Sequence, residues 1–191
     1  IDLTEGNKIN SASLEAVLAG RLMANQSALS VAALMIGSNI QDAATELNEY
    51  GVDEIYVQND SLLQNYNPDL FLFVLEKACE IINPGFILMA DSLVAQDLAP
   101  RAAFRLNGAL ITDCVNINYE SEAFYYSKPV YSGNVTAVFS TDAKPQIAVL
   151  RSHIYEAAKP VQNKNTKITP LNVQIDPSKT TMEILERIKD E

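Results

Sequence analysis

Phe86-Ile-Leu-Met-Ala90 and the nearby Asp97-Leu-Ala-Pro-Arg-Ala-Ala103 together indicate the fold class of this chain. The first segment is a continuous apolar run, which is typical of a strand buried on both faces of a parallel sheet. The second predicts a helix over Gln96–Leu106, with Pro100 in its first turn and Asp97 near its positive end. Alternating strands and helices form α/β folds, whose ligand sites lie just past the carboxyl ends of the strands.

The same alternation of strand and helix extends over the first half of the chain. Apolar spacing and capping residues predict three further helices: Ser13–Met23 capped by Asn10 or Ser11, a helix capped by Ser38 or Asn39 that runs through Tyr50 to a C-cap at Gly51, and Asp69–Ile82. Short apolar runs predict strands at Ser30–Ile36, read as buried on both faces, and at Glu54–Val57. We therefore expect a three-layer α/β/α domain with a mostly parallel, Rossmann-like sheet.

The second half of the chain changes character, because few helices separate its strands. Strands are expected at Ala109–Asn118, Ala123–Tyr126, Asn134–Ser140 and Gln146–Leu150. This order favours antiparallel pairing at one edge of the sheet.

The chain divides into a domain over residues 1–158 and an arm or linker over residues 159–191. Lys159–Pro170 is polar and rich in turn-forming residues, Leu171–Ile175 alternates like a strand, and Thr181–Lys189 fits either a helix or a strand. At the other end, Ile1-Asp2-Leu3 resembles the tail of a strand, without an initiator methionine or a signal-peptide pattern. We expect the chain to be a trimmed fragment.

Composition excludes several classes of function. Only 14 Lys and Arg face 24 Asp and Glu, for a formal net charge of −10, and no basic block is present, so nucleic acid and anionic membranes are poor partners. No run of the sequence reaches the ~18 apolar residues that span a bilayer. Cys79 and Cys114 stand apart in apolar contexts, which favours small core residues in a reducing compartment. We expect a cytoplasmic protein, or one of the mitochondrial matrix if the source is eukaryotic.

No catalytic or metal-binding constellation is evident. The only histidine, His153, follows a predicted strand end with no nucleophile nearby, so we expect a surface or loop residue, and one histidine with two scattered cysteines gives no zinc pattern. Gly37-Ser38-Asn39 is a weak candidate for anion binding at a helix N-terminus, although a plain helix cap explains it as well. Asp97 and Arg101 have the spacing of an i,i+4 ion pair. These give four weak cofactor-binding candidates: Gly37, Ser38, Asp97 and Arg101.

Tyr125, Tyr126 and Tyr131 gather around Lys128-Pro129. Such a group fits either a partner surface or cross-strand packing at a sheet edge, and the sequence favours neither.

Several short motifs follow one another along the chain: Gly51-Val-Asp-Glu-Ile-Tyr-Val57, Asp97-Leu-Ala-Pro-Arg-Ala-Ala103, Thr112-Asp113-Cys114, Tyr131-Ser-Gly-Asn134, and Pro145-Gln146 running to Arg151. In this order and spacing the sequence resembles the N-terminal domain of the alpha subunit of electron-transferring flavoproteins. The resemblance covers roughly Asn10 to Arg151.

The resemblance implies a fold similar to adenine-nucleotide alpha hydrolases. It implies pairing with a beta subunit, which keeps AMP or a second flavin, and FAD held mostly by a separate C-terminal domain of the alpha subunit. Such heterodimers carry electrons from flavin dehydrogenases to a membrane quinone oxidoreductase, as in fatty acid beta-oxidation, or take part in electron bifurcation. The flavin domain would begin where this chain stops. Ala90 and Ala95 replace family glycines, and Ser152-His153 replaces a Pro-Gly pair, so we expect this chain not to hold FAD or AMP tightly.

The first hypothesis is therefore a non-catalytic scaffold and heterodimer interface within an electron carrier. In it, Asp97 and Arg101 fix a strand–helix junction, while Tyr131, Gly133, Asn134 and Arg151 support the edge facing the partner. The alternative is a stand-alone adenine-nucleotide-binding signalling module with its site at Gly37–Asn39 and Ala90–Asp97. A hydrolase is a weaker third option, because no nucleophile elbow is present.

Overall fold

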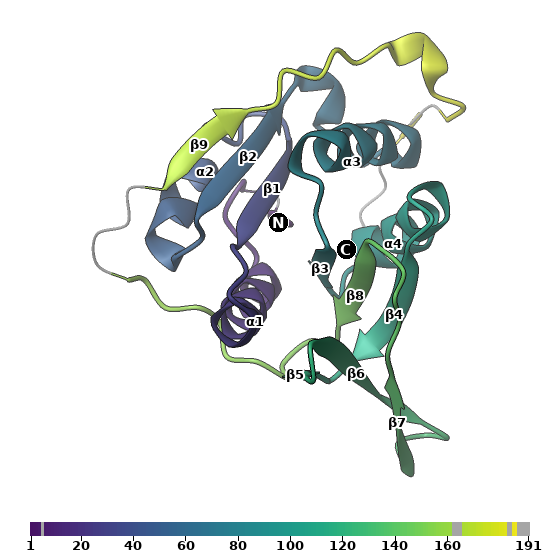
Figure 1. Ribbon diagram of the computed structural model, residues 1–191. Helices are drawn as coiled ribbons and strands as arrows, with labels where there is room; N and C mark the ends of the chain where they lie inside the picture. The colour runs from purple at the N-terminus through teal and green to yellow at the C-terminus, as the bar shows by residue number, and fades with distance from the viewer. Residues whose placement is uncertain (5, 162–165, 183–184, 187–191) are drawn as a thin grey trace, which may run out of the picture.

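The computed structural model describes residues 1–4, 6–161, 166–182 and 185–186 (Figure 1). Its helices are α1 Ser11–Ser27, α2 Gln41–Leu47, α3 Pro68–Ile82 and α4 Leu93–Arg105, with short 3-10 turns η1 Asn48–Tyr50, η2 Ser61–Leu63 and η3 Pro177–Lys179. Its strands are β1 Ala32–Gly37, β2 Glu54–Asn59, β3 Phe86–Ala90, β4 Ala109–Cys114, β5 Asn116–Glu120, β6 Ala123–Val130, β7 Val135–Phe139, β8 Gln146–Leu150 and β9 Lys167–Pro170.

The first sheet has the strand order β1-β2-β9 and is parallel throughout. Strand β9 comes from the segment expected to be an arm, and it pairs with β2 in the register Glu54↔Lys167. The Glu54 carboxylate accepts hydrogen bonds from Lys167 Nζ at 2.9 Å and Thr169 Oγ1 at 2.7 Å. These hydrogen bonds, Lys167's first, lower the pKa of Glu54 to about 2. Residues Lys167–Pro170 of the expected arm are thus part of the sheet.

The strand predicted at Leu171–Ile175 is wrong. Its alternating apolar residues do not enter a sheet: Leu171 and Ile175 pack on the cluster formed by Leu63, Leu70 and Val74. The Gln58 side chain holds this segment in place through the backbone N–H and carbonyl of Val173, each at 2.9 Å. The segment Thr181–Lys189 lies partly outside the described residues.

The second sheet has the order β3-β8-β4 and is also parallel. The bounds predicted for β3 and β8 are confirmed, but the antiparallel placement expected for β8 is wrong. Strand β8 lies between β3 and β4, and all five of its residues are buried. Its apolar side chains, Ile147 to Leu150, pack on both faces, which suits a central parallel strand rather than an edge.

Strands β5, β6 and β7 pair antiparallel, as expected, but they form a separate sheet rather than an edge of the parallel one. The single strand expected at Ala109–Asn118 is wrong, because it divides into β4, which is parallel to β8, and β5. Beyond its contact with β4, the β6–β7 hairpin extends away from the rest of the molecule at the bottom right of Figure 1. We call residues 123–139, which include β6 and β7, the hairpin arm.

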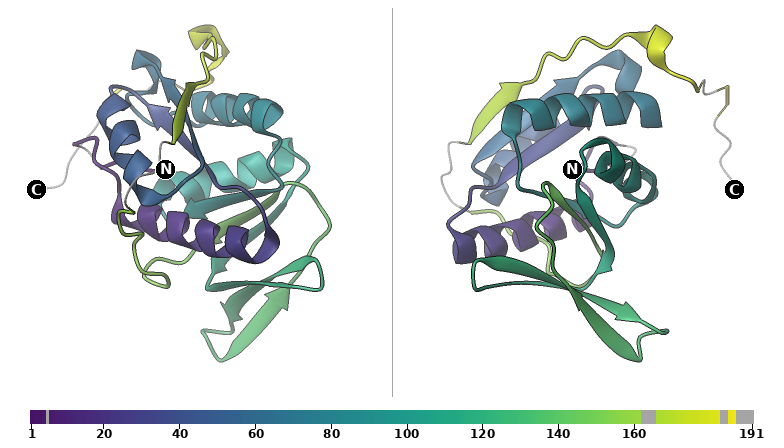
Figure 2. Two further views of the ribbon diagram at one scale, coloured as in Figure 1. Left: turned by 60° about the vertical axis from the view of Figure 1, so that its left-hand side comes forward. Right: turned by 45° about the vertical axis from the view of Figure 1, so that its right-hand side comes forward.

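The layers follow from the alternation of side chains along β8. Ala148 and Leu150 pack with Ala19 and Met23 of α1 on one face of the sheet. Ile147 and Val149 pack on the opposite face, with Leu75 of α3 and Leu98 of α4 among their neighbours. Figure 2 shows these helices on opposite sides of the strands. The expected three-layer α/β/α architecture is confirmed.

Two helix starts and two strand environments differ from the sequence-based expectation. Helix α4 begins at Leu93 rather than Gln96, because the Ser92 hydroxyl caps the helix, so Pro100 is inside it rather than in its first turn. Neither Ser38 nor Asn39 caps α2, whose N-cap is Ile40 without a side-chain bond. Strands β1 and β3 are not buried on both faces: Ala32 is exposed, and all five residues of β3 are half-buried.

Candidate functional site

The N-terminus of α4 is occupied by the protein's own side chains. The Ser92 hydroxyl accepts a hydrogen bond from the backbone N–H of Ala95 at 3.0 Å and donates one to the Asp2 carboxylate at 2.5 Å. A helix N-terminus attracts anions, and here a carboxylate already lies beside it. A phosphate approaching this end of the helix would meet the negative charge of Asp2.

Asp97 and Arg101 form the ion pair that their spacing predicts. Arg101 Nε donates to Asp97 Oδ1 at 2.9 Å, and the hydroxyl of Tyr66 donates to Asp97 Oδ2 at 2.7 Å. The Tyr66 bond and the guanidinium lower the pKa of Asp97, while burial and the carboxylate raise the pKa of Tyr66. Tyr66 precedes α3, so Asp97 links α4 to the segment that leads into α3. Sequence reasoning missed Tyr66, which carries no local signal for this contact.

The Gly37–Asn39 turn is explained by packing within the chain. A Cβ on Gly37 would lie 2.9 Å from Ile40 Cγ2, so a larger residue would force a shift there. The carbonyls of Ser38 and Asn39 accept hydrogen bonds from Asn7 Nδ2 at 3.3 and 3.2 Å. Helix α2 after this turn has only seven residues. Gly37 and Ser38 therefore lie in a turn held by Asn7, and the turn is separate from the Asp97–Arg101 pair.

Arg151 joins the ends of β8 and β4. Its Nε and Nη2 donate to the two carboxylate oxygens of Asp113 at 2.6 and 2.7 Å, and its backbone N–H donates to the Cys114 carbonyl at 2.9 Å. Asp113 has φ of 59°, at a register shift between Ile111 and Cys114. The pairing with the guanidinium lowers the pKa of Asp113. Arg151 thus supports the carboxyl edge of the second sheet.

The turn of the hairpin arm contains the other predicted interface residues. Tyr131, Ser132 and Gly133 all have positive φ values, of 50°, 56° and 87°, and the Asn134 amide donates to the Tyr131 carbonyl at 2.9 Å. Gly133 adopts this conformation without the strain that a side chain would add. The turn leaves the Tyr131 side chain 80% exposed at the tip of the arm.

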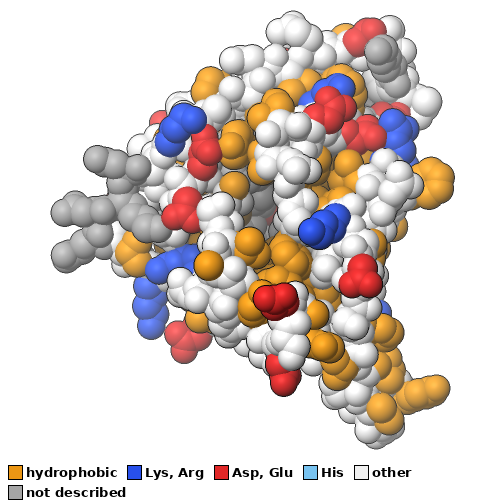
Figure 3. All heavy atoms as spheres, viewed as in Figure 1, with side chains coloured by type: hydrophobic (Ala, Val, Ile, Leu, Met, Phe, Trp, Pro, Cys, Tyr) orange, Lys and Arg blue, Asp and Glu red, His pale blue; other side chains and the backbone are white. Residues whose placement is uncertain are grey.

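The hairpin arm also exposes a set of apolar side chains. Val135 is 50% exposed, Val138 60% and Phe139 44%, and Tyr131 lies at their end. Figure 3 shows hydrophobic side chains along this arm at the lower right of the molecule. Among the described residues, β7 pairs only with β6. Because side chains alternate along a strand, Val135 and Phe139 lie on one face of β7 and Val138 on the other. Exposed apolar side chains on both faces of a strand with a free edge are typical of a partner-binding element.

The three tyrosines near Lys128-Pro129 do not form one patch. Tyr126 is fully buried, and its hydroxyl donates to Gln146 Oε1 at 2.6 Å, whereas Tyr125 is half-buried and Tyr131 is exposed. Gln146 in turn donates to the Thr141 carbonyl at 2.8 Å. Tyr126 therefore belongs to the core and anchors the arm to the start of β8. Sequence reasoning named Gln146 within a motif but did not pair it with Tyr126.

The remaining titratable candidates are His153, Cys79 and Cys114. The His153 side chain is 89% exposed, as predicted, and its backbone N–H donates to the Glu15 carboxylate at 2.7 Å. Cys79 and Cys114 are free thiols, and burial raises the pKa of Cys79 to about 11. Within residues 1–4, 6–161, 166–182 and 185–186, no group of His, Cys, Asp and Glu is placed to hold a metal ion, and no helix is long and apolar enough to cross a membrane.

The structure thus gathers the candidates into separate places: a capped and ion-paired α4, a sheet edge closed by Arg151, and an exposed hairpin arm. Asp113 at the carboxyl end of β4 is paired with Arg151, and Asp97 on α4 is paired with Arg101. This is the architecture of an α/β domain with a protruding hairpin arm.

The sequence matches the family described as "Electron transfer flavoprotein domain" over residues 1–176. The chain belongs to this family, whose members are electron carriers, and it corresponds to the N-terminal part of its alpha-subunit relatives. This confirms the resemblance seen in the sequence motifs.

Three relatives illustrate the match. "Protein FixB" of Clostridium saccharobutylicum is 30% identical over 95% of this chain and 55% of its own length. The "Electron transfer flavoprotein subunit alpha" of Bacillus subtilis is 27% identical over 96% of this chain and 56% of its own length. The "Lactate dehydrogenase (NAD(+),ferredoxin) subunit LctC" of Acetobacterium woodii is 28% identical over 100% and 46%. The chain spans about half the length of these curated relatives.

Proposed function

We propose that this chain is the platform of an electron transfer flavoprotein alpha subunit, and that it supplies shape and a subunit-contact surface while the flavin performs the redox chemistry. Family membership supports the class of protein. The single observation that carries the contact role is the exposed apolar surface of the hairpin arm, formed by Tyr131, Val135, Val138 and Phe139. The beta subunit is the partner that this surface would meet.

The arm is built to hold its surface in a fixed position. Tyr126 joins β6 to Gln146 of β8 through a buried hydrogen bond, and Lys128 Nζ donates to Thr112 Oγ1 of β4 at 2.8 Å. A contact surface that is already ordered loses less conformational entropy when it binds. Tyr131, Gly133 and Asn134 shape the tip of the arm, and Arg151 stabilises the strand ends beside Asp113.

The alternative, an adenine-nucleotide-binding signalling module, finds no support in the geometry. Its site would use the Gly37–Asn39 turn and the start of α4, but Asn7 occupies the first and Asp2 the second. We propose that FAD is bound in the intact heterodimer and not by this chain alone, and that AMP is bound by the beta subunit.

The wider proposal follows the family. The heterodimer would accept electrons from flavin dehydrogenases and deliver them to a quinone-linked acceptor, as in fatty acid beta-oxidation. We propose a cytoplasmic location, where Cys79 and Cys114 stay reduced.

The contact role is tested by co-purifying this chain with an electron transfer flavoprotein beta subunit from the same genome. Val138→Asp in the arm should weaken the complex at least tenfold, because a buried carboxylate at an apolar contact costs more than about 1.4 kcal/mol. Phe104→Asp is the matched control, since Phe104 is 83% exposed on α4, away from the arm, and it should leave the affinity unchanged.

If both variants weaken the complex with the beta subunit equally, or if neither variant weakens it, the arm is not part of the interface. Calorimetry of the purified chain with AMP and with ATP separates the two functions. Micromolar affinity for either nucleotide would support the signalling module instead.

A further inference from the structure

Helix α4 ends in a cap formed by Asn107 and Gly108. Asn107 has φ of 51°, in the left-handed region that asparagine adopts more readily than most residues with a side chain. Its backbone N–H donates to the Phe104 carbonyl at 3.4 Å, and the Gly108 N–H donates to the Ala103 carbonyl at 2.9 Å. These two bonds make a Schellman motif, which turns the chain out of α4 and into β4.

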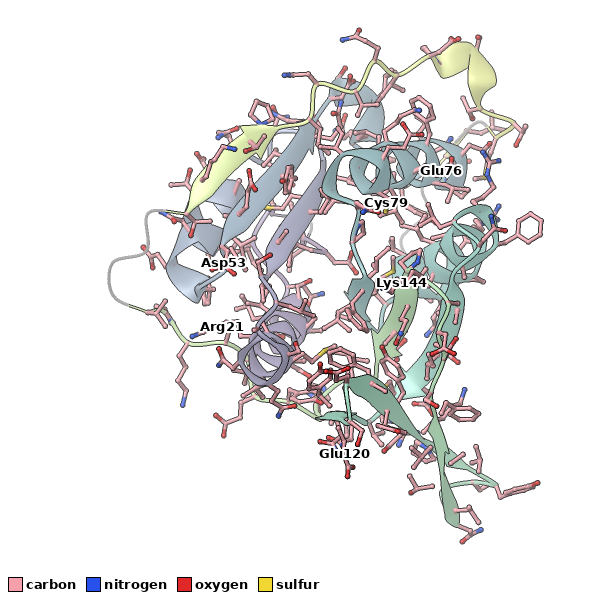
Figure 4. The ribbon with its side chains drawn as sticks, viewed as in Figure 1. Arg21, Asp53, Glu76, Cys79, Glu120 and Lys144 are labelled. Carbon is pink, nitrogen blue, oxygen red and sulfur yellow. The ribbon has the colours of Figure 1, made fainter. Side chains whose placement is uncertain are left out.

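Gly108 is needed for a different reason, which is its close approach to the segment before β8. A Cβ on Gly108 would collide with the backbone carbonyl oxygen of Pro145. The same oxygen accepts a hydrogen bond from the Ala109 N–H at 3.2 Å. Figure 4 shows Lys144, the residue before Pro145, beside the start of β8. The cap therefore favours asparagine at position 107, and the packing of β8 against the cap favours glycine at position 108.

Together these two requirements create a chemically labile pair. Asparagine is a thermolabile residue, and it is most reactive before glycine, because no side chain then hinders attack by the next backbone nitrogen. The pair Asn-Gly occurs once in the sequence. Among the described residues, four other asparagines have positive φ values, but a larger residue follows each of them: Asn7, Asn39, Asn83 and Asn172.

The reaction of this pair needs no co-reactant except water. The backbone nitrogen of Gly108 loses its proton and attacks the side-chain carbonyl carbon of Asn107. The new C–N bond closes a succinimide ring, and the side-chain amide takes up a proton and leaves as ammonia. Water then opens the ring at either carbonyl, which gives aspartate or isoaspartate at position 107. The Asn107 side chain is exposed, so water has access to it.

The fold restrains the attacking nitrogen. The Gly108 N–H is bonded to the Ala103 carbonyl on the helix side, and the next N–H along the chain is bonded to Pro145 on the sheet side. The end of α4 is fixed as well, because Arg105 donates to the carboxylate of Glu76, labelled on α3 in Figure 4, at 2.8 and 3.3 Å. Gly108 can turn its nitrogen toward the Asn107 side chain only after the cap has opened.

We propose that Asn107-Gly108 is a site of spontaneous covalent modification, closed in the folded chain and reactive when the end of α4 opens. The product then prevents the cap from closing. Isoaspartate carries the main chain through its side-chain carbon, which adds one methylene before Gly108, where Pro145 leaves no spare room. Both products also place a carboxylate at the negative end of the α4 dipole. The modification therefore records the time that the chain has spent locally or fully unfolded.

The test incubates the complete chain at mildly alkaline pH, folded in buffer and unfolded in guanidinium chloride. Peptide mapping by mass spectrometry follows the conversion of each asparagine, and chromatography separates isoaspartate from aspartate. Position 107 should react at least tenfold faster in the unfolded chain, because reaction in the folded chain is limited to the small open population. Asn10, which precedes Ser11, is the internal reference and should react more slowly than Asn107 once both are unfolded.

The matched control variant is Asn107→Gly, which keeps a residue suited to the left-handed cap and removes the reactive amide. Both chains are treated in guanidinium chloride and refolded by dilution. The treated parent chain should contain a fraction that melts at a lower temperature and carries isoaspartate at position 107. The treated variant should melt at the same temperature as its untreated sample.

Four outcomes would overturn the proposal. Equal rates at position 107 in the folded and unfolded chains would mean that the cap does not restrain the reaction. An unfolded chain in which Asn10 reacts as fast as Asn107 would remove the special reactivity of the pair. A modified parent chain that melts like the unmodified one would mean that the product does not disturb the cap. An equal loss of stability in the treated Asn107→Gly variant would assign the loss to damage elsewhere.

Discussion

Replacing Tyr126 with Phe tests the anchor of the hairpin arm. The ring is fully buried, and its hydroxyl donates a 2.6 Å bond to Gln146 Oε1, which is itself nearly buried. The Gln146 side-chain amide also donates a hydrogen bond to the Thr141 carbonyl, which holds the side chain in that orientation, so it cannot turn to find another donor. Phe keeps the packing of the ring but leaves the Gln146 oxygen without this donor, which costs about 1–3 kcal/mol.

The assay is thermal and urea unfolding of the complete chain. For a domain of this size, each kcal/mol lowers the melting temperature by roughly 2–4 °C. The control is Tyr125→Phe, one residue earlier on β6 and only half-buried, which should change the stability by less than about 0.5 kcal/mol. If Tyr126→Phe is no more destabilising than Tyr125→Phe, the buried bond does not anchor the arm and the reasoning fails.

Two further substitutions probe packing and charge. Gly108→Ala would place a Cβ against the backbone carbonyl of Pro145, so we expect the free energy of unfolding, measured by chemical denaturation, to fall by about 1–3 kcal/mol. Gly85→Ala is the control, because its Cβ would meet open space and should cost less. Equal losses for the two variants would contradict the close approach at Gly108. Asp97→Asn should destabilise the chain by less than about 1 kcal/mol at neutral pH, because Asp97 is partly exposed. The folded pKa of Asp97 is lowered, so the advantage of the parent chain is present above the unfolded pKa of about 4 and is lost as pH falls through the folded pKa. A difference in stability that stays constant from neutral pH down to acid unfolding would refute it.

The local elements were largely predictable from sequence because their signals are local. The apolar runs of β3 and β8 gave their bounds, and Asn10 caps α1 as its position before the helix indicated. The start of α4 was missed, because Pro100 suggested a first turn while the Ser92 cap lies a full turn earlier. Pairing was harder: β8 enters between β3 and β4, and no local pattern records which strands a buried run will separate.

The candidate site residues divide in the same way, into contacts that local sequence predicts and contacts that depend on how distant strands pair. The Asp97–Arg101 pair was predictable, since a spacing of four residues places both side chains on the same face of one helix. The Asp113–Arg151 pair joins residues on different strands, and its bidentate geometry depends on the register shift in β4. Tyr126 and Tyr131 looked alike in sequence, but Tyr126 lies within β6 and is buried, whereas Tyr131 lies in the turn beyond β6 and is exposed.

The central place of β8 has a consequence for synthesis on the ribosome. Strands β3 and β4 are neighbours only through β8, which is translated last of the three. At about 5–20 residues per second, the roughly 60 residues between the end of β3 and the end of β8 take about 3–12 s to emerge. During that delay the nascent chain carries first β3 alone, and then β3 and β4, without the strand that joins them. This makes it a natural client for chaperones that shield emerging polypeptides.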